Sequence, residues 1–229
     1  MKRFTLAFSV VALAIGLAST ASAQLGTNFF KKPNIADIFR PEVGKGAAYE
    51  MKDKDGKART MEMSVVGKDV VEGKEAYWME IAHNDESAEG MAYVKMLLTK
   101  DDFQPHRMIM QQPGKQAMEI PMNPMMKSHT KMNDEMEKWK SAGTETITVP
   151  AGTFVCEHWT KEVGKEDVWV SSKVSPMGLV KQVSEHSTMT LVKVISDAKD
   201  HITGTPQVFD PAMLRQQMME KMQKDHPKP

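Results

Sequence analysis

Turn signals recur about every ten residues from Tyr49 onward, and this spacing constrains the fold more than any other feature of the chain. Glycine accepts positive φ and proline presets φ, so both residue types favour tight turns. We expect turns at Asp55-Gly56, Glu72-Gly73, 84–89, Asp101-Asp102, Pro113-Gly114, 150–152, Gly164-Lys165 and 176–178. Short segments between regularly spaced turns are typical of an antiparallel β meander.

The segments between these turns alternate in polarity with the period of a strand. Tyr77, Met79 and Ile81 fall on one face of their segment, whereas Trp78 and Glu80 fall on the other. Similar runs occupy 92–98, 144–149, 154–159, 168–170, 179–183 and 189–194. We count about eleven strands by this pattern, and a sheet of that size curves or closes. The predicted fold is mainly β, a strongly curved antiparallel sheet or incomplete β-barrel.

Two segments lack the strand pattern and carry helix formers instead. The first is 123–140, where Asn123 can cap the first turn, Pro124 suits the first helical position and Gly143 follows the end. The second begins at Asp210, and one face of it carries Met213 or Leu214, Met218 and Met222. We therefore predict one inserted helix and one C-terminal amphipathic helix.

The N-terminal residues have the layout of a secretory signal peptide. Lys2-Arg3 precede an apolar run from Phe4 to Leu17, and the small residues 21–23 form a cleavage site. Gln24 stands where a lipoprotein would need cysteine, so we expect no lipid anchor. No second long apolar run follows, and we expect no membrane span. The predicted location is the periplasm or the medium of a Gram-negative-type bacterium.

Composition narrows the function classes further. The chain has 30 basic and 30 acidic residues, a balance that argues against nucleic acid as a partner. Its single cysteine can form neither an internal disulfide nor a cysteine-based zinc site. We divide the chain into a signal peptide (1–23), an N-terminal segment (24–44), one curved β domain (45–209) with the helical insertion 123–140, and a C-terminal helix and tail (210–229).

One stretch of sequence resembles a known family. The segment 143–158 reads GTETITVPAGTFVCEH, and DVWV at 167–170 and GLVK at 178–181 follow it. This order of strand, VPAGTF turn, strand and hairpin resembles uncharacterised exported bacterial proteins related to the LolA/LolB lipoprotein-carrier superfamily. The resemblance implies a curved antiparallel sheet whose concave side is plugged by helices, with 123–140 as such a plug. It implies no catalytic residues.

Signatures of catalysis are scarce. The sequence contains no GxSxG, HExxH, GxGxxG or GxxxxGK[ST] motif. Ser128 and Lys131 fit the short SxxK pattern, but its companion motifs SDN and KTG are missing, so a hydrolase is a remote alternative. Cys156 and His158 lie two apart on a predicted strand and therefore point to the same face. They could form a thiolate pair or half of a metal site, or they could be a buried cysteine beside a half-exposed histidine. We predict no enzymatic activity and no cofactor.

Methionine is the most unusual component, with 21 residues in the chain. Several methionines lie two apart on predicted strands, and others form one stripe on the predicted helix 123–140 together with His129 and Trp139. Three interpretations are open: a flexible core, an adaptable apolar pocket, or a Cu(I) site built from soft thioethers. A surface that scavenges oxidants through reversible methionine sulfoxide is a remaining alternative.

We take the pocket as the main functional hypothesis: a non-enzymatic exported protein that binds a lipid, an acyl chain or a lipidated partner. The ligand contacts expected for it are Met122, Met125, Met126, His129, Met132 and Met136. The alternative is a Cu(I)-binding protein that uses Met125, His129, Met132 and Met136.

Overall fold

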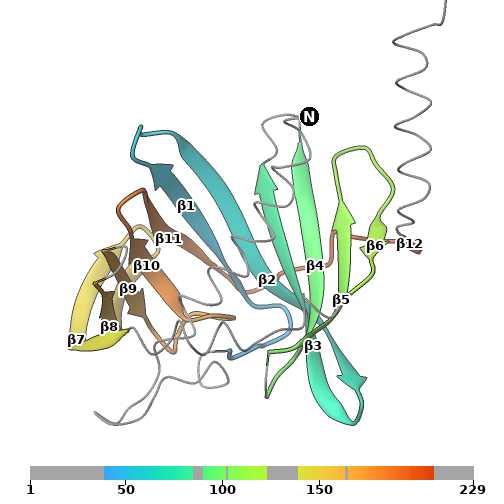
Figure 1. The fold of residues 1–229 in the computed structure, drawn as a ribbon, viewed down its shortest axis with the longest axis horizontal. Coiled ribbons are helices and arrows are strands. Elements are labelled where there is room, and N and C mark those ends of the chain that lie inside the picture. The colour runs from blue at the N-terminus through green and yellow to red at the C-terminus, as the bar shows by residue number, and fades with distance from the viewer. Residues whose placement is uncertain (1–38, 85–89, 102, 123–138, 163–164, 209–229) are drawn as a thin grey trace, which may run out of the picture.

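A computed structural model describes residues 39–84, 90–101, 103–122, 139–162 and 165–208. These residues form a single open sheet of twelve strands, which curves strongly (Figure 1). The strand order across the sheet is β12-β6-β5-β4-β3-β2-β1-β11-β10-β9-β8-β7. Neighbouring strands are antiparallel except for β12 and β6, which are parallel. The prediction of a mainly β, curved antiparallel sheet is confirmed.

The strands follow one another along the chain with short connections. Their bounds are β1 Gly46–Asp53, β2 Ala58–Val71, β3 Lys74–Asn84, β4 Met91–Thr99, β5 Pro105–Gln111, β6 Met118–Ile120, β7 Lys140–Val149, β8 Gly152–Lys161, β9 Glu166–Val170, β10 Leu179–Val183, β11 Ser187–Ile195 and β12 Gln207–Val208. Among the described residues, the predicted turns fall between two of these strands or at the end of one, as Asn84 and Gly152 do. Glu72 and Gly73 show why, because both have positive φ, 51° and 78°, as the tight hairpin between β2 and β3 requires.

Irregularities in strand pairing account for part of the curvature. The register shifts within β1, β2, β4, β7 and β10. A β-bulge bends its strand and increases the local twist. In β2 the shift lies between Val65 and Gly67, and a Cβ on Gly67 would stand 3.3 Å from Cδ1 of Trp78. Glycine therefore lets the bent strand lie close to the indole.

The predicted helices lie outside the described residues, apart from the last two positions of the first. Lys140 begins β7, and Trp139 is buried in the core, so the helix cannot extend to Lys140 as predicted. Gly143 lies inside β7 at a register shift with φ 102°, not beyond a helix end. A positive-φ glycine serves a bulge as well as a helix stop, which explains this error. No helix in the described ranges is long and apolar enough to cross a membrane.

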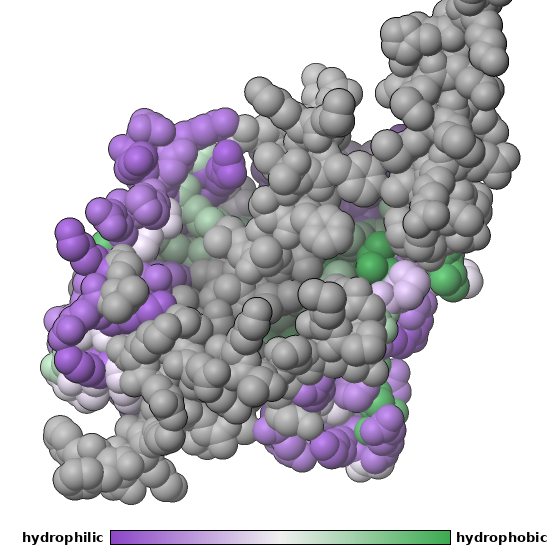
Figure 2. All heavy atoms as spheres, in the orientation of Figure 1, coloured by the Kyte–Doolittle hydropathy of each residue, from purple (hydrophilic) through white to green (hydrophobic). Residues whose placement is uncertain are grey.

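The main hydrophobic core lies largely on one face of the sheet, which we call the inner face. Its buried residues come from β1 to β5 and from β7 to β11, and Phe39 joins them ahead of the first strand. The Phe39 ring packs edge-on against Phe103, with 4.9 Å between ring centroids. Figure 2 shows hydrophilic residues along the rim of the molecule and hydrophobic residues set deeper beside them.

The opposite, outer face of the sheet is also covered where β3, β4 and β5 meet. The chain after β11 crosses this face on its way to β12 (Figure 1), and Ile202 packs there against Ile109 and Ala117. Glu80 and Lys95, which face each other in the register of β3 and β4, are buried beneath the crossing segment, at 3% and 7% exposure. The sequence pattern predicts one buried face, and the structure buries part of both.

Four polar side chains join the crossing segment to the sheet, and we call them the outer polar cluster. Glu80 and Lys95 belong to the sheet, and Asp200 and His201 belong to the segment. The Glu80 carboxylate accepts from the backbone N–H of His201 at 3.1 Å and lies 2.6 Å from its Nδ1. Lys95 Nζ lies 2.5 Å from Oδ2 of Asp200. Burial raises the pKa of Glu80, and the hydrogen bonds with His201 oppose this rise.

Candidate binding wall on the inner face

Methionine side chains lie next to one another on the inner face because the strand register aligns them. Met108, Met96 and Met79 face each other in turn on β5, β4 and β3, and all three are buried. The paired residues of an antiparallel ladder point to the same face. Thioethers therefore run across three neighbouring strands in one row.

We call the methionine-bearing part of the inner face the inner wall. Its methionines are Met51, Met61, Met63, Met79, Met96, Met108, Met110 and Met189. Met51 and Met110 are half-buried, and the others are buried. Methionine has three rotatable bonds and a polarisable sulfur, so it packs against irregular shapes at low cost. A wall of this composition can adapt to apolar groups of different shape.

The inner wall continues into polar residues on the neighbouring strands. Met51 of β1 faces Met189 of β11, and Met189 faces Gln182 of β10. The same row passes from Gln182 through Val168 of β9 to Trp159 of β8. Two residues along their strands from this row, Glu157 and Glu166 share its face.

Glu157, Trp159, Glu166 and Gln182 form what we call the inner polar cluster. Each contributes one buried polar atom that has no hydrogen-bond partner in the described part of the chain: Glu157 Oε2, Trp159 Nε1, Glu166 Oε2 and Gln182 Oε1. The Trp159 side chain is only 5% exposed. Buried polar atoms are paired in the great majority of cases, so four unpaired atoms on the same face of three neighbouring strands require an explanation.

The charges around the inner polar cluster are balanced in pairs. Burial raises the pKa of Glu157, and the nearby Trp159 indole N–H and the charge of Arg40 oppose this rise. The indole approaches the carboxylate without a hydrogen bond of normal geometry. Glu166 Oε1 lies 3.8 Å from Nζ of Lys161. Each carboxylate of the cluster therefore has one cation nearby.

Only one of the predicted ligand contacts lies among the described residues. Met122 is half-buried and packs against the main core, next to the inner wall. The other predicted contacts, together with the SxxK pair, lie outside the described residues: Met125, Met126, His129, Met132, Met136, Ser128 and Lys131. The copper and hydrolase alternatives rest on these residues and stay predictions.

The side chains of Cys156 and His158 contact different groups. The Cys156 thiol is 1% exposed, with its sulfur 3.7 Å from the carbonyl oxygen of Phe154. His158 lies with Nε2 2.9 Å from Asp167 and Nδ1 2.9 Å from Glu145, and its ring stacks on another aromatic side chain. Among the residues that the structure describes, no three His, Cys, Asp or Glu side chains are grouped to hold a metal ion.

The Cys156 thiol is expected to resist alkylation while the protein is folded. Burial, with a smaller effect from the charge of Glu145, raises its pKa to about 11 from the ordinary value of 9.0. Because the thiolate is the reactive form, this shift alone lowers the labelling rate about 100-fold below pH 9, before steric shielding. Iodoacetamide labelling followed by mass spectrometry, with and without urea, measures this protection. Equal rates in both conditions would contradict the buried placement.

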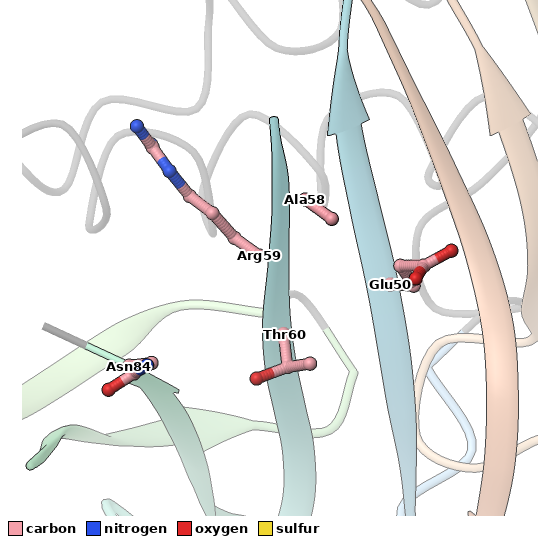
Figure 3. Close-up of a pocket in the computed structure, with 5 residues that line it drawn as sticks. All are labelled: Glu50, Ala58, Arg59, Thr60 and Asn84. Carbon is pink, nitrogen blue, oxygen red and sulfur yellow. The ribbon is translucent and has the colours of Figure 1, made fainter. Parts of the chain in front are cut away.

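A small pocket lies elsewhere, between β1, β2 and the end of β3 (Figure 3). Its volume is about 160 Å³, and it is lined by Glu50, Ala58, Arg59, Thr60 and Asn84. Glu50 and Thr60 are register partners and alternate with Tyr49 and Met61 of the inner face. Ligand pockets generally have about 300 Å³ or more, so this polar recess is too small for an acyl chain.

The comparisons with known proteins give distant structural neighbours. No family model and no curated protein matches the chain. A lipoprotein from Parabacteroides distasonis is similar with a TM-score of 0.37 and 16% identity, over 69% of this chain and 97% of that one. An exported protein with a YmcC-like fold from Bacteroides fragilis is similar with a TM-score of 0.36 and 14% identity, over 69% of this chain and 98% of that one. Both neighbours are described only as putative.

Neither structural neighbour is named as a member of the LolA/LolB superfamily. The resemblance of segment 143–158 to lipoprotein carriers therefore stays a prediction. Both neighbours are described as exported proteins or lipoproteins, and the expectation from Gln24 that this chain has no lipid anchor stays a prediction.

Proposed function

We propose that this protein is a non-enzymatic binding protein that holds the acyl chain of a lipid or lipidated partner against the inner wall. The observation that supports it is the alignment of methionines in register across neighbouring strands of a curved sheet. A row of aliphatic side chains would favour one ligand shape. Thioether side chains repack, and methionine-rich surfaces are accordingly used by proteins that accept varied apolar partners.

The two described residues that suggested nucleophilic chemistry, Cys156 and His158, are engaged within the fold. The Cys156 thiol is buried and its pKa is raised, which disfavours the reactive thiolate. His158 is held between Glu145 and Asp167, so both ring nitrogens are already engaged. The Cys156 side chain contributes to the core, and His158 links β8 to Glu145 of β7 and Asp167 of β9.

The inner wall is shielded from solvent, so a ligand reaches it only if side chains repack. This sets a clear test. Protein purified from its native host is examined by native mass spectrometry and lipid extraction, and the delipidated protein is titrated with the fluorescent probe N-phenyl-1-naphthylamine. We expect a co-purifying acyl lipid and saturable probe binding that a free acyl compound displaces.

Two tryptophan substitutions on β11 locate the site. Met189→Trp fills space on the inner wall and is expected to weaken probe binding about tenfold, because an added ring overfills a packed apolar surface. Val194→Trp, at a position on the same strand that is 42% exposed, is the control and should leave the affinity unchanged. Absence of both lipid and probe binding would overturn the proposal. Cu(I) binding that Met125→Ala abolishes, without lipid binding, would favour the copper alternative.

A further inference from the structure

We infer that the inner polar cluster binds the head group of the ligand, and that this head group is neutral and rich in hydrogen-bond donors, such as a glycerol hydroxyl or an amide N–H. The inference rests on the proposed function, because it assigns the polar end of a ligand whose chain lies on the inner wall. It is carried by the four unpaired polar atoms of Glu157, Trp159, Glu166 and Gln182.

The unpaired atoms define which head groups fit. Glu157 Oε2, Glu166 Oε2 and Gln182 Oε1 are acceptors, and Trp159 Nε1 is a donor. A buried acceptor without a donor costs free energy, so a ligand that supplies hydroxyl or amide hydrogens gains by pairing it. A free carboxylate has no donor to offer. It would leave the three acceptors unpaired and place a further negative charge beside two carboxylates.

The charge balance favours a neutral head over a cationic one. Glu166 has Lys161 at 3.8 Å, and the charge of Arg40 acts on Glu157. A cationic head group would therefore face a cation beside each carboxylate. Three of the four unpaired atoms are acceptors, and a hydroxyl or an amide supplies donors to them without adding charge.

The position of the cluster matches a ligand with one polar and one apolar end. Gln182 faces Met189, and Met189 faces Met51 on the next strand. Neighbouring strands are about 4.8 Å apart, so the thioethers of this row begin one strand away from Gln182 and reach about 10 Å from it. A chain attached to a head group at Gln182 would pass directly onto the inner wall.

Three compounds with the same acyl chain separate the contributions of donors and of charge. Monodecanoylglycerol carries hydroxyl donors, methyl decanoate is neutral without donors, and decanoate is charged without donors. Each is titrated into the delipidated mature protein by displacement of the fluorescent probe. We expect monodecanoylglycerol to bind at least about tenfold more tightly than either of the other two, because only it satisfies the buried acceptors.

Substitutions in the inner polar cluster test whether its residues cause the preference for monodecanoylglycerol. Gln182→Leu removes one acceptor at nearly constant volume, and Glu157→Gln removes a carboxylate. Each is expected to narrow the preference for monodecanoylglycerol over methyl decanoate to about threefold or less, while methyl decanoate binds as before. Glu162→Gln makes the same chemical change at an exposed site and is the control. Circular dichroism confirms that each variant is folded.

The outcomes distinguish this inference from the proposed function. Equal binding of the three compounds, or an unchanged preference in both Gln182→Leu and Glu157→Gln, would overturn the head-group assignment and leave the acyl site standing. Tighter binding of decanoate would overturn it as well. Failure of all three compounds to displace the probe would overturn the proposed function itself.

Discussion

Gly178→Ala is expected to destabilise the protein by about 2 to 4 kcal/mol. Gly178 has φ 71°, and a Cβ there would stand 2.6 Å from Cγ1 of Val170 and 3.2 Å from the backbone oxygen of Ser171. The backbone conformation costs alanine about 1 kcal/mol or more, and the added methyl overfills a packed turn for a further 1 to 3 kcal/mol, roughly. Ser171 is restrained because its backbone N–H donates to the Gly178 carbonyl at 2.7 Å, and Val170 is packed in the core.

Gly114→Ala separates these two costs. Gly114 has a similar φ of 65°, but a Cβ there would meet nothing within 4 Å. Its replacement is expected to cost only the conformational part, about 1 kcal/mol. Urea denaturation of both variants measures the difference between their free energies of unfolding, provided that the dependence on urea concentration has the same slope in each. Equal losses would show that the turn before β10 relaxes around the methyl group and that its packing is loose.

The architecture could be predicted because its determinants are local. Turn residues such as Glu72 and Gly73 place the hairpins, and alternation along segments such as 92–98 identifies the strands between them. The error at Gly143 has a physical cause: a positive-φ glycine after a helix-forming segment is compatible with both a helix stop and a bulge. Only the pairing of β7 with β8 decides between them.

The place of Gln182 in the inner polar cluster could not be predicted, because the face on which it lies depends on a register shift. In β10 the shift between Leu179 and Lys181 places both Leu179 and Gln182 opposite core residues of β9. A register shift of one residue exchanges the two faces of a strand, and no local sequence feature predicts such a shift. A signal did exist for the outer polar cluster. Glu80 and Lys95 each stand alone within an apolar run, as paired buried charges do.

Asp200→Ala is expected to cost about 2 to 3 kcal/mol and to loosen the segment that crosses the outer face. The substitution leaves the ammonium group of Lys95, 7% exposed, with the Ile202 carbonyl at 3.4 Å as its remaining contact from that segment. It also removes the acceptor for the backbone N–H of Ile202, which Asp200 Oδ1 holds at 3.0 Å. The Asp200 side chain is itself 39% exposed, which keeps the expected loss below that of a fully buried pair.

A double substitution tests whether the buried charge causes the loss. Lys95→Met in the Asp200→Ala background replaces the unpaired ammonium with an apolar side chain of similar length, still over the Trp78 ring that Lys95 now contacts at 5.2 Å. The double variant should therefore be more stable than Asp200→Ala alone, because removing both partners of a buried pair costs less than removing one. Urea denaturation gives the stabilities, and hydrogen exchange of amides 198–206 shows whether the loss is local. A double variant less stable than the single one would mean that Lys95 acts through its contact with Trp78 and not through its charge on Asp200.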